Sequence, residues 1–269
     1  MVWVLGLAVL AGMTAVMLCA WAYGLARQNG GWTDVFWTFG TGAALAVAAL
    51  YPWTPDATPQ PRQWLVAALV AVWTIRLGGY LAPRVASHPE DPRYAKFRRD
   101  WGEAYAPKML FVTLPQAPAT ALLSLSVIVA AHAPGEGLGL RDALGAALLL
   151  AAAVGEYQAD TQMRRFKAEP ANRGKVADTG LWGWSRHPNY FFQWLGWMAY
   201  PAIGFDPARP ITWLTFTAPV VMFLLLTRVS GIPPLEAAQV RSKGEAYRRY
   251  QARVSAFFPL PPRSTEGTA

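Results

Sequence analysis

Long apolar runs alternate with shorter polar segments along most of the chain. Each run approaches or exceeds the roughly 20 residues that a helix needs to cross the hydrocarbon core of a membrane. The first run could also be a signal peptide, but no Lys or Arg precedes Val4 and only a short turn separates it from the second run. The pattern therefore predicts seven transmembrane helices, at Val2–Ala26, Trp32–Trp53, Gln63–Pro83, Met109–His132, Asp142–Met163, Asn189–Phe205 and Ile211–Gly231.

The composition agrees with a polytopic, all-α membrane protein. Of the 269 residues, 54% are hydrophobic and only 15% are charged, which leaves too little polar surface to cover a soluble globule. We expect one membrane domain over residues 1–263 and a disordered tail at 264–269. The only cysteine is Cys19, so no intrachain disulfide or thiolate metal cluster can form, and no metal site is predicted.

The basic residues predict the orientation of the helices. They gather after the third, fifth and seventh runs, at 84–108, 164–186 and 228–263, whereas the alternate connections, after the second, fourth and sixth runs, hold only Arg62, Arg141 and Arg209. Because short cytoplasmic loops collect Lys and Arg, the N-terminus is expected outside and the C-terminus in the cytoplasm, with the protein in the cytoplasmic (inner) membrane. The first basic loop, "EDPRYAKFRRDWGEAYAPK", has the mixed basic and aromatic pattern of an interfacial amphipathic helix.

Charged residues inside the apolar runs indicate a polar cavity. Each costs at least ~2.5 kcal/mol at membrane depth and is retained mainly where it is paired or used. Glu156 and Asp160 are four residues apart and share a helix face, which Arg164 continues. With the predicted orientation, all the buried charges fall in the cytoplasmic half; they are Asp34, Arg76, Glu156, Asp160 and Arg228. A cavity open to the cytoplasm is one interpretation, and a simple interhelical ion pair of Arg76 with Glu156 or Asp160 is the other.

The stretch "SRHPNYF" places a polar cluster directly before the sixth run. Pro188 suits the first turn of a helix, and the free N–H groups there, with Arg186 and His187 beside them, could hold an anion. A topological role at the membrane surface is the alternative. The chain has no G-x-G-x-x-G after a strand, and "NRGKVADTG" lacks the spacing of a P-loop, so any nucleotide must lie among helices.

Several motifs together carry a family resemblance. The stretches "DTQMRRFK", "NRGKVADTGLWGWSRHPNYF", "TRVSGIPPLE", "RQNGGWTDVFW" and "WTIRLGGY" resemble the bacterial branch of the steroid 5α-reductase family, a DUF1295-like branch long described as a domain of unknown function. The similarity extends over nearly the whole chain. Its R-H-P-x-Y core is also shared with isoprenylcysteine carboxyl methyltransferases and sterol C14-reductases.

The resemblance implies a seven-helix membrane oxidoreductase. In such a protein NADPH lies in a cytoplasmic cavity and reduces a C=C bond conjugated to a carbonyl in a steroid-like or other lipid. Asp160, Asn189 and Arg228 would contact the cofactor, and Arg76, Tyr80 and Arg84 would line the nucleotide channel. The full set of predicted cofactor-binding residues is Arg76, Tyr80, Arg84, Glu156, Asp160, Arg164, Lys175, Trp184, Arg186, His187, Asn189, Tyr190, Arg228 and Glu236.

The catalytic motif departs from that of the steroid reductases. There a Gln-Glu pair in the second helix and a Tyr in the third hold the substrate carbonyl, whereas Trp73 stands at the Tyr position here. Asp34 would replace the Glu, and Tyr23 or Tyr80 would supply the phenol. An Asp kept neutral by aromatic neighbours can donate a hydrogen bond to an enolate. The alternative is that Asp34, or its neighbour Thr33, merely caps the second helix.

Two other functions fit the same sequence. The first is an S-adenosylmethionine-dependent lipid methyltransferase, and the second is a non-catalytic lipid-binding membrane protein. S-adenosylmethionine carries no phosphate and gives little reason for Arg76, Arg164 and Arg228, so NADPH is the favoured cofactor. The expected partners are a lipid or steroid-like small molecule and membrane lipids. No nucleic acid or obligate protein partner is predicted.

Overall fold

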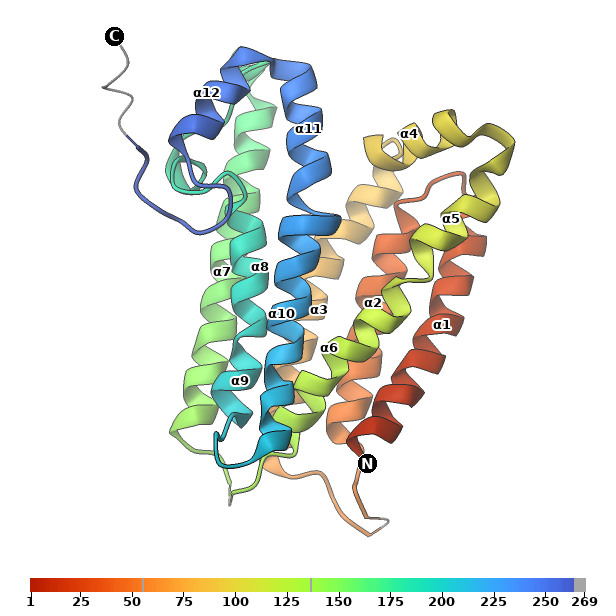
Figure 1. Ribbon diagram of the computed structural model, residues 1–269, viewed down its shortest axis with the longest axis vertical. Helices are drawn as coiled ribbons and strands as arrows, with labels where there is room; N and C mark the ends of the chain where they lie inside the picture. Colours follow the sequence, from red (N-terminus) through yellow and green to blue (C-terminus); the bar gives the residue numbers. More distant parts are fainter. Residues whose placement is uncertain (55, 136, 264–269) are drawn as a thin grey trace. The chain divides into compact units, whose positions relative to one another are not determined.

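The computed structural model describes residues 1–54, 56–135 and 137–263, and regular structure in this part of the chain is almost wholly helical (Figure 1). Outside the helices, the described residues form one isolated parallel β-bridge, between Ser185 and Ser255. The expected all-α fold is therefore confirmed. The expected disordered tail lies outside the described residues.

The chain divides into two compact units. Unit 1 contains Met1–Ala146 and Tyr200–Ala218, and unit 2 contains Ala147–Ala199 and the residues from Pro219 onward. Helix α7 (Leu140–Ala168) begins in the first unit and ends in the second. The single-domain expectation stays a prediction.

Unit 1 is built mainly from long helices. They are α1 (Val2–Ala26), α2 (Trp32–Leu50), α3 (Pro61–Ser87), α4 (Pro92–Trp101), α5 (Tyr105–Thr113) and α6 (Gln116–Ala131), followed after α7 by most of α9 (Ala199–Gly204) and a 3₁₀ segment, Pro210–Phe216. In Figure 1, α1, α2 and α6 run side by side, and their packing contacts agree. Met13, Met17 and Ile128 are almost completely buried in the core between these helices.

The sequence of α1 explains why it forms a membrane helix. Its 25 residues span about 37 Å, and they are apolar around the whole circumference. Trp3, Val4 and Leu7 remain exposed although they are large and apolar. A helix that is apolar on every side packs with one face against its neighbours and presents the other to lipid.

Helices α2 and α3 approach closely at small residues. A Cβ atom at Gly42 would collide with the side chain of Thr74, and one at Gly78 would meet the ring of Phe39 at 2.5 Å. Small residues allow membrane helices to pack backbone against backbone. This close contact fixes the position of the α2 start, where Asp34 lies.

Unit 2 combines the end of α7 with shorter helices. These are α8 (Pro188–Trp197), most of α10 (Thr217–Leu224), a π-helical turn (Leu225–Val229), α11 (Ile232–Lys243) and α12 (Glu245–Arg253), with 3₁₀ turns at Pro170–Asn172 and Gly180–Gly183. Gly155 of α7 lies against the ring of Phe192, which lets α7 and α8 pack together.

Among the described residues, five helical segments are long and apolar enough to cross a membrane, namely Val2–Ala26, Trp32–Leu50, Pro61–Ser87, Pro92–Ala131 and Pro210–Lys243. The protein is thus a membrane protein with several apolar helices, whereas the seven-span count and the orientation stay predictions. The expected span Met109–His132 lies almost entirely within the segment Pro92–Ala131, where a turn separates α5, which ends at Thr113, from α6, which begins at Gln116. The expected helix Asn189–Phe205 is likewise split between α8 and α9.

Candidate functional site

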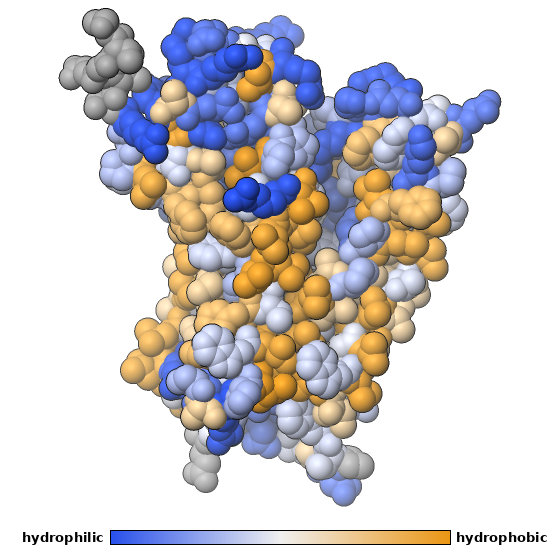
Figure 2. Space-filling model, in the orientation of Figure 1, coloured by the Kyte–Doolittle hydropathy of each residue, from blue (hydrophilic) through white to orange (hydrophobic). Residues whose placement is uncertain are grey.

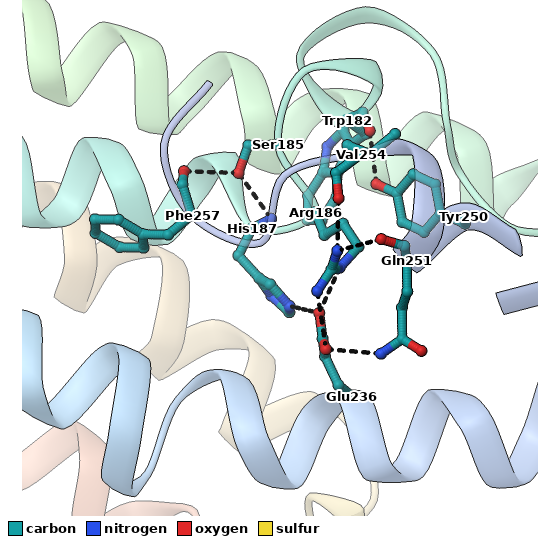
Figure 3. A network of polar contacts seen from close by, with 9 residues as sticks. All are labelled: Trp182, Ser185, Arg186, His187, Glu236, Tyr250, Gln251, Val254 and Phe257. Carbon is teal, nitrogen blue, oxygen red and sulfur yellow. Dashed lines mark hydrogen bonds and ion pairs between the residues drawn. The ribbon is translucent and has the colours of Figure 1, made fainter. Parts of the chain in front are cut away.

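Arg186, just before α8, lies at the centre of a polar network in unit 2 (Figure 3). Its Nε donates to Glu236 Oε1 at 2.6 Å and its Nη2 to Glu236 Oε2 at 3.2 Å. Its Nη1 donates to the backbone carbonyls of Gln251 and Val254. The side chains of Arg186 and Glu236 are only 11% and 14% exposed. All three guanidinium nitrogens thus have protein acceptors, and Arg186 joins α11 and α12 to the start of α8.

The same glutamate orients His187. The His187 Nε2 lies 3.2 Å from Glu236 Oε1, and Gln251 Nε2 donates to Glu236 Oε2 at 2.8 Å. Because the carboxylate is an acceptor, Nε2 carries the hydrogen of this contact. The imidazole is buried and stacks on the Tyr190 ring at 5.6 Å. His187 is therefore held in one orientation at the N-terminus of α8.

The chain after α12 returns to the segment Ser185–His187 before α8, which we call the α8 corner. The Ser185 hydroxyl donates to the Phe257 carbonyl at 2.9 Å and accepts from the His187 backbone N–H at 3.1 Å. The Arg186 backbone N–H donates to the Ser255 carbonyl at 2.8 Å. Ser185 and Arg186 are thus bonded to the segment after α12, and His187 is bonded to Ser185. Together these bonds fix the backbone on either side of Arg186.

Tyr250 of α12 adds a further bond to the network. Its hydroxyl donates to the Trp182 carbonyl at 2.6 Å. Burial raises the pKa of Tyr250 well above its usual value, so the phenol keeps its proton and remains a donor. Trp182 in turn donates through Nε1 to the Ala159 carbonyl of α7 at 3.0 Å. The network thus reaches from α12 to the helix that carries Asp160.

A buried acid and amide form the second part of the site. Asn189 Nδ2 of α8 donates to Asp160 Oδ1 of α7 at 3.2 Å. Asp160 and Glu156 are 6% and 7% exposed. The predicted shared face of these two acids thus points into unit 2, and the structure brings Asp160 together with Asn189 as partners. A carboxylate and a carboxamide side by side can hold hydroxyl and amide groups of a bound molecule.

The remaining predicted residues of unit 2 lie at its surface. Arg164 donates to the Thr161 hydroxyl at 2.8 Å, and its guanidinium stands 6.0 Å from the Tyr157 ring. Arg228 is exposed in the π-helical turn, a form of helix that is frequent at functional sites. Lys175 and Trp184 are exposed as well.

Asp34 of unit 1 makes contacts that the sequence did not predict. Its Oδ1 accepts from the Tyr94 hydroxyl at 2.9 Å, and its Oδ2 accepts from Arg93 Nη2 at 3.2 Å. Helix α2 begins at Trp32 with Gly31 as its N-cap and no side-chain cap bond. The cap interpretation of Asp34 and Thr33 is therefore wrong. Asp34 belongs instead to a cluster with the first turn of α4.

Tyr94 is the phenol that sequence reasoning missed. It is buried against Tyr105 and Met109, in the cluster that also contains Trp21 and Phe97. The aromatic face of this basic segment therefore packs inside unit 1. The sequence shows Tyr94 as one of the aromatic residues in the basic loop. No local pattern, however, connects this loop with Asp34, which lies 60 positions earlier.

Asp91 holds the start of α4 in place. Its Oδ1 accepts from the backbone N–H and from Nε of Arg93, both at 3.0 Å, and so caps the helix. Burial acts to raise the pKa of Asp91, but the charge and hydrogen bonds of Arg93 outweigh it and lower the pKa below 3.8. The same ion pairs position Arg93 for its contact with Asp34.

The other predicted residues of unit 1 have separate surroundings. The Tyr23 ring packs on Trp32, with centroids 5.1 Å apart. The Arg76 guanidinium lies 6.0 Å from the Tyr80 ring on α3. Further contacts are those of Arg84 Nη2 with Asp91 Oδ2 at 3.4 Å and of Trp73 with Trp37 at 5.9 Å. The roles of Tyr23, Tyr80, Arg76 and Arg84 stay predictions.

These features define a multi-pass membrane protein with a buried polar site in unit 2 and an Asp-Tyr-Arg cluster in unit 1. The chain belongs to the family described as "Protein of unknown function (DUF1295)", whose model matches residues 20–254. This confirms the family expected from the motifs, whereas its link to the steroid 5α-reductases stays a prediction. Comparison with curated proteins and with solved structures found no match.

Proposed function

We propose that this protein is an NADPH-dependent membrane reductase that acts on a C=C bond conjugated to a carbonyl in a lipid substrate. The observation that carries the proposal is the buried Asp160–Asn189 pair beside the fixed His187, since these three residues belong to the motifs that resemble the steroid 5α-reductases. The proposal includes seven membrane spans in one domain, an outside N-terminus and a site that faces the cytoplasm.

The donor set of unit 2 fits a dinucleotide. Asp160 and Asn189 offer a buried acceptor and an amide to ribose hydroxyls or to the nicotinamide carboxamide. Phosphates need cations or free N–H groups, and Arg164, Lys175 and Arg228 are exposed on the same unit. Arg186 has a different task, because Glu236 and two carbonyls already occupy its nitrogens. Its role is to hold α11 and α12 against the α8 corner.

NADPH, which Asp160 and Asn189 would hold, would supply a hydride to the β-carbon of the conjugated C=C bond and so become NADP⁺. The electron pair of the double bond then moves onto the carbonyl oxygen as an enolate, and a proton added at the α-carbon completes the reduction. The protein must present a donor to the enolate oxygen. The proposed donor is the Tyr94 hydroxyl: its one hydrogen points to Asp34 Oδ1 at 2.9 Å in the structure and would have to turn to the enolate oxygen in the complex, while Arg93, 3.2 Å from Asp34 Oδ2, would still pair with the carboxylate.

The contacts of Asp34 favour a positioning role over the donor role expected from the sequence. Both of its oxygens accept hydrogen bonds, one of them from a guanidinium. Such a carboxylate acts as an acceptor that orients its neighbours. We therefore assign the donor role to Tyr94 and the positioning role to Asp34, and Tyr23 and Tyr80 become the secondary candidates.

A ligand panel tests the proposal. A ligand that binds only the folded protein raises its thermal stability by mass action. The purified protein in mild detergent should be stabilised by NADPH, and Asn189→Ala should need about tenfold more NADPH for the same shift. Stabilisation by S-adenosylmethionine alone would instead indicate the methyltransferase. A response to neither ligand would favour the non-catalytic alternative.

A further inference from the structure

Helix α12 presents two different faces. Tyr247, Tyr250 and the following Val254 are buried and pack together with Val176 and Val240. The opposite face is exposed and basic, and it carries Arg248 and Arg249. In Figure 2 the surface over α12 is mostly hydrophilic, whereas that over α10 is mostly hydrophobic. The apolar side of α12 is therefore already covered by protein, and its basic side is available.

Three arginines lie close together at the end of this helix. Arg249 and Arg253 are four residues apart and share a face of α12. The backbone N–H of Arg263 donates to the Arg253 carbonyl at 2.9 Å, so the returning chain places a third arginine next to them. Asp178 pairs with Arg253 at 2.8 Å. With Asp178, and with Glu245 one turn before Arg249, the three arginines still leave this end of α12 with an excess of positive charge.

Exposed apolar side chains belong to the returning segment and to Trp184, to which this segment is hydrogen-bonded. Trp184, Phe258 and Leu260 are 49%, 45% and 54% exposed. The Leu260 backbone N–H donates to the Trp184 carbonyl at 3.0 Å, and the Phe258 ring lies 5.7 Å from the Trp194 ring. A tryptophan and two large apolar side chains held at the surface beside arginines match the boundary between lipid headgroups and acyl chains, where tryptophan is enriched.

We propose that this C-terminal patch, made of Arg249, Arg253, Arg263, Trp184, Phe258 and Leu260, binds an anionic phospholipid. The arginines contact the headgroup phosphate, and the apolar side chains lie at the top of the acyl region. An anionic leaflet attracts such basic segments more strongly than a neutral one. The combination favours a lipid over a nucleic acid or a free anion, because neither of these would cover the three apolar side chains.

The patch shares Trp184 with the predicted cofactor-binding set but contains neither Asp160 nor Asn189. The inference holds whether or not the protein reduces a lipid. Its consequence is structural: a bound lipid would hold down the same segment, Ser255–Phe257, that bonds to Ser185 and Arg186.

A lipid titration tests the proposal. The full-length protein in mild detergent is titrated with dioctanoyl phosphatidylglycerol or with dioctanoyl phosphatidylcholine, and the melting temperature is followed. The anionic lipid should raise it more than the neutral one. The double variant R249Q/R263Q should need about thirtyfold more phosphatidylglycerol for half of the shift, from the usual contribution of a basic residue at an anionic surface. The melting temperature of the double variant without lipid shows whether this variant is folded.

A matched variant separates a specific patch from general charge. R165Q/R173Q removes the same charge from exposed positions elsewhere in unit 2 and should titrate like the unaltered protein. Leu260→Ser keeps all charges and should weaken the response to phosphatidylglycerol. Equal responses to both lipids, an equal loss in R165Q/R173Q, or equal stabilisation by inorganic phosphate would each overturn the proposal.

Discussion

Breaking the Arg186–Glu236 ion pair should destabilise unit 2 strongly. The two side chains are largely buried and joined at 2.6 and 3.2 Å, so solvent screens them little. Removing one partner of a buried pair leaves the other charge uncompensated, which costs ~3–5 kcal/mol. Glu236→Leu also removes the acceptor of His187 and Gln251. We expect a loss of about 4 kcal/mol for Glu236→Leu and about 3 kcal/mol for Arg186→Leu.

A double-mutant cycle isolates the pair. The variant with both substitutions leaves no unpaired charge, so its loss should fall short of the sum of the single losses by about 2 kcal/mol. The free energy of unfolding is measured in mixed detergent micelles by tryptophan fluorescence. Asp178→Asn serves as the control, because the Asp178–Arg253 pair is 42% and 41% exposed and should be worth less than about 1 kcal/mol.

Two results would refute this reasoning. If each single substitution changed the free energy of unfolding by no more than the control does, the network would not hold unit 2 together. If the losses added without coupling, Arg186 and Glu236 would act through separate contacts, and the assignment of Arg186 as the residue that shapes the corner would fail.

The remaining predictions concern the cofactor, the proton donor and pH. Arg228→Ala should weaken NADPH binding about ten- to a hundredfold, as expected for a lost charge-assisted bond to phosphate, and unchanged affinity in a folded protein would count against this contact. Tyr94→Phe should leave NADPH affinity unchanged and lower turnover of an enone substrate by about a hundredfold or more, whereas normal turnover would remove Tyr94 from the mechanism. Because Arg93 lowers the pKa of Asp91, the stabilisation by Asp91 is complete above pH 3.8 and is lost as the pH falls through the lowered pKa. Asp91→Asn should therefore cost about 1 kcal/mol at neutral pH and nothing in strong acid, and a loss that is independent of pH would contradict the ion pair.

Much of the helical framework follows from the apolar runs. The first run matches α1 at both ends, and the third matches α3 within a turn, since a run of this length has few alternatives to a helix. The breaks were not predicted. The window-averaged hydropathy of Pro92–Ala131 is high although the helix is interrupted between Thr113 and Gln116, and a second interruption lies between Trp197 and Ala199. Such breaks depend on prolines and on packing against other helices, which an average over a window does not register.

The candidate site was predictable as a set of residues but not as a set of contacts. Asp160 and Asn189 were both expected at the cofactor, and they prove to be hydrogen-bonded partners 29 positions apart. Arg186 and Glu236, 50 positions apart, were also both expected there, yet they bind each other. Tyr94 was missed because only the folded chain brings α4 to the start of α2. Residue types reveal what chemistry is possible, and tertiary packing decides which groups remain available for it.

Deuteride transfer tests the proposed function most directly. The purified protein is incubated with NADPH deuterated at the transferred position of C4 and with a bacterial lipid extract, and the lipids are compared by mass spectrometry with those from Tyr94→Phe. The reductase predicts a lipid product that gains one deuterium and one solvent hydrogen, at a rate that falls strongly in the variant. A parallel incubation contains S-adenosylmethionine labelled in its methyl group in place of NADPH. No deuterium in any lipid would contradict the reductase, and a labelled methyl group in a lipid would indicate the methyltransferase instead.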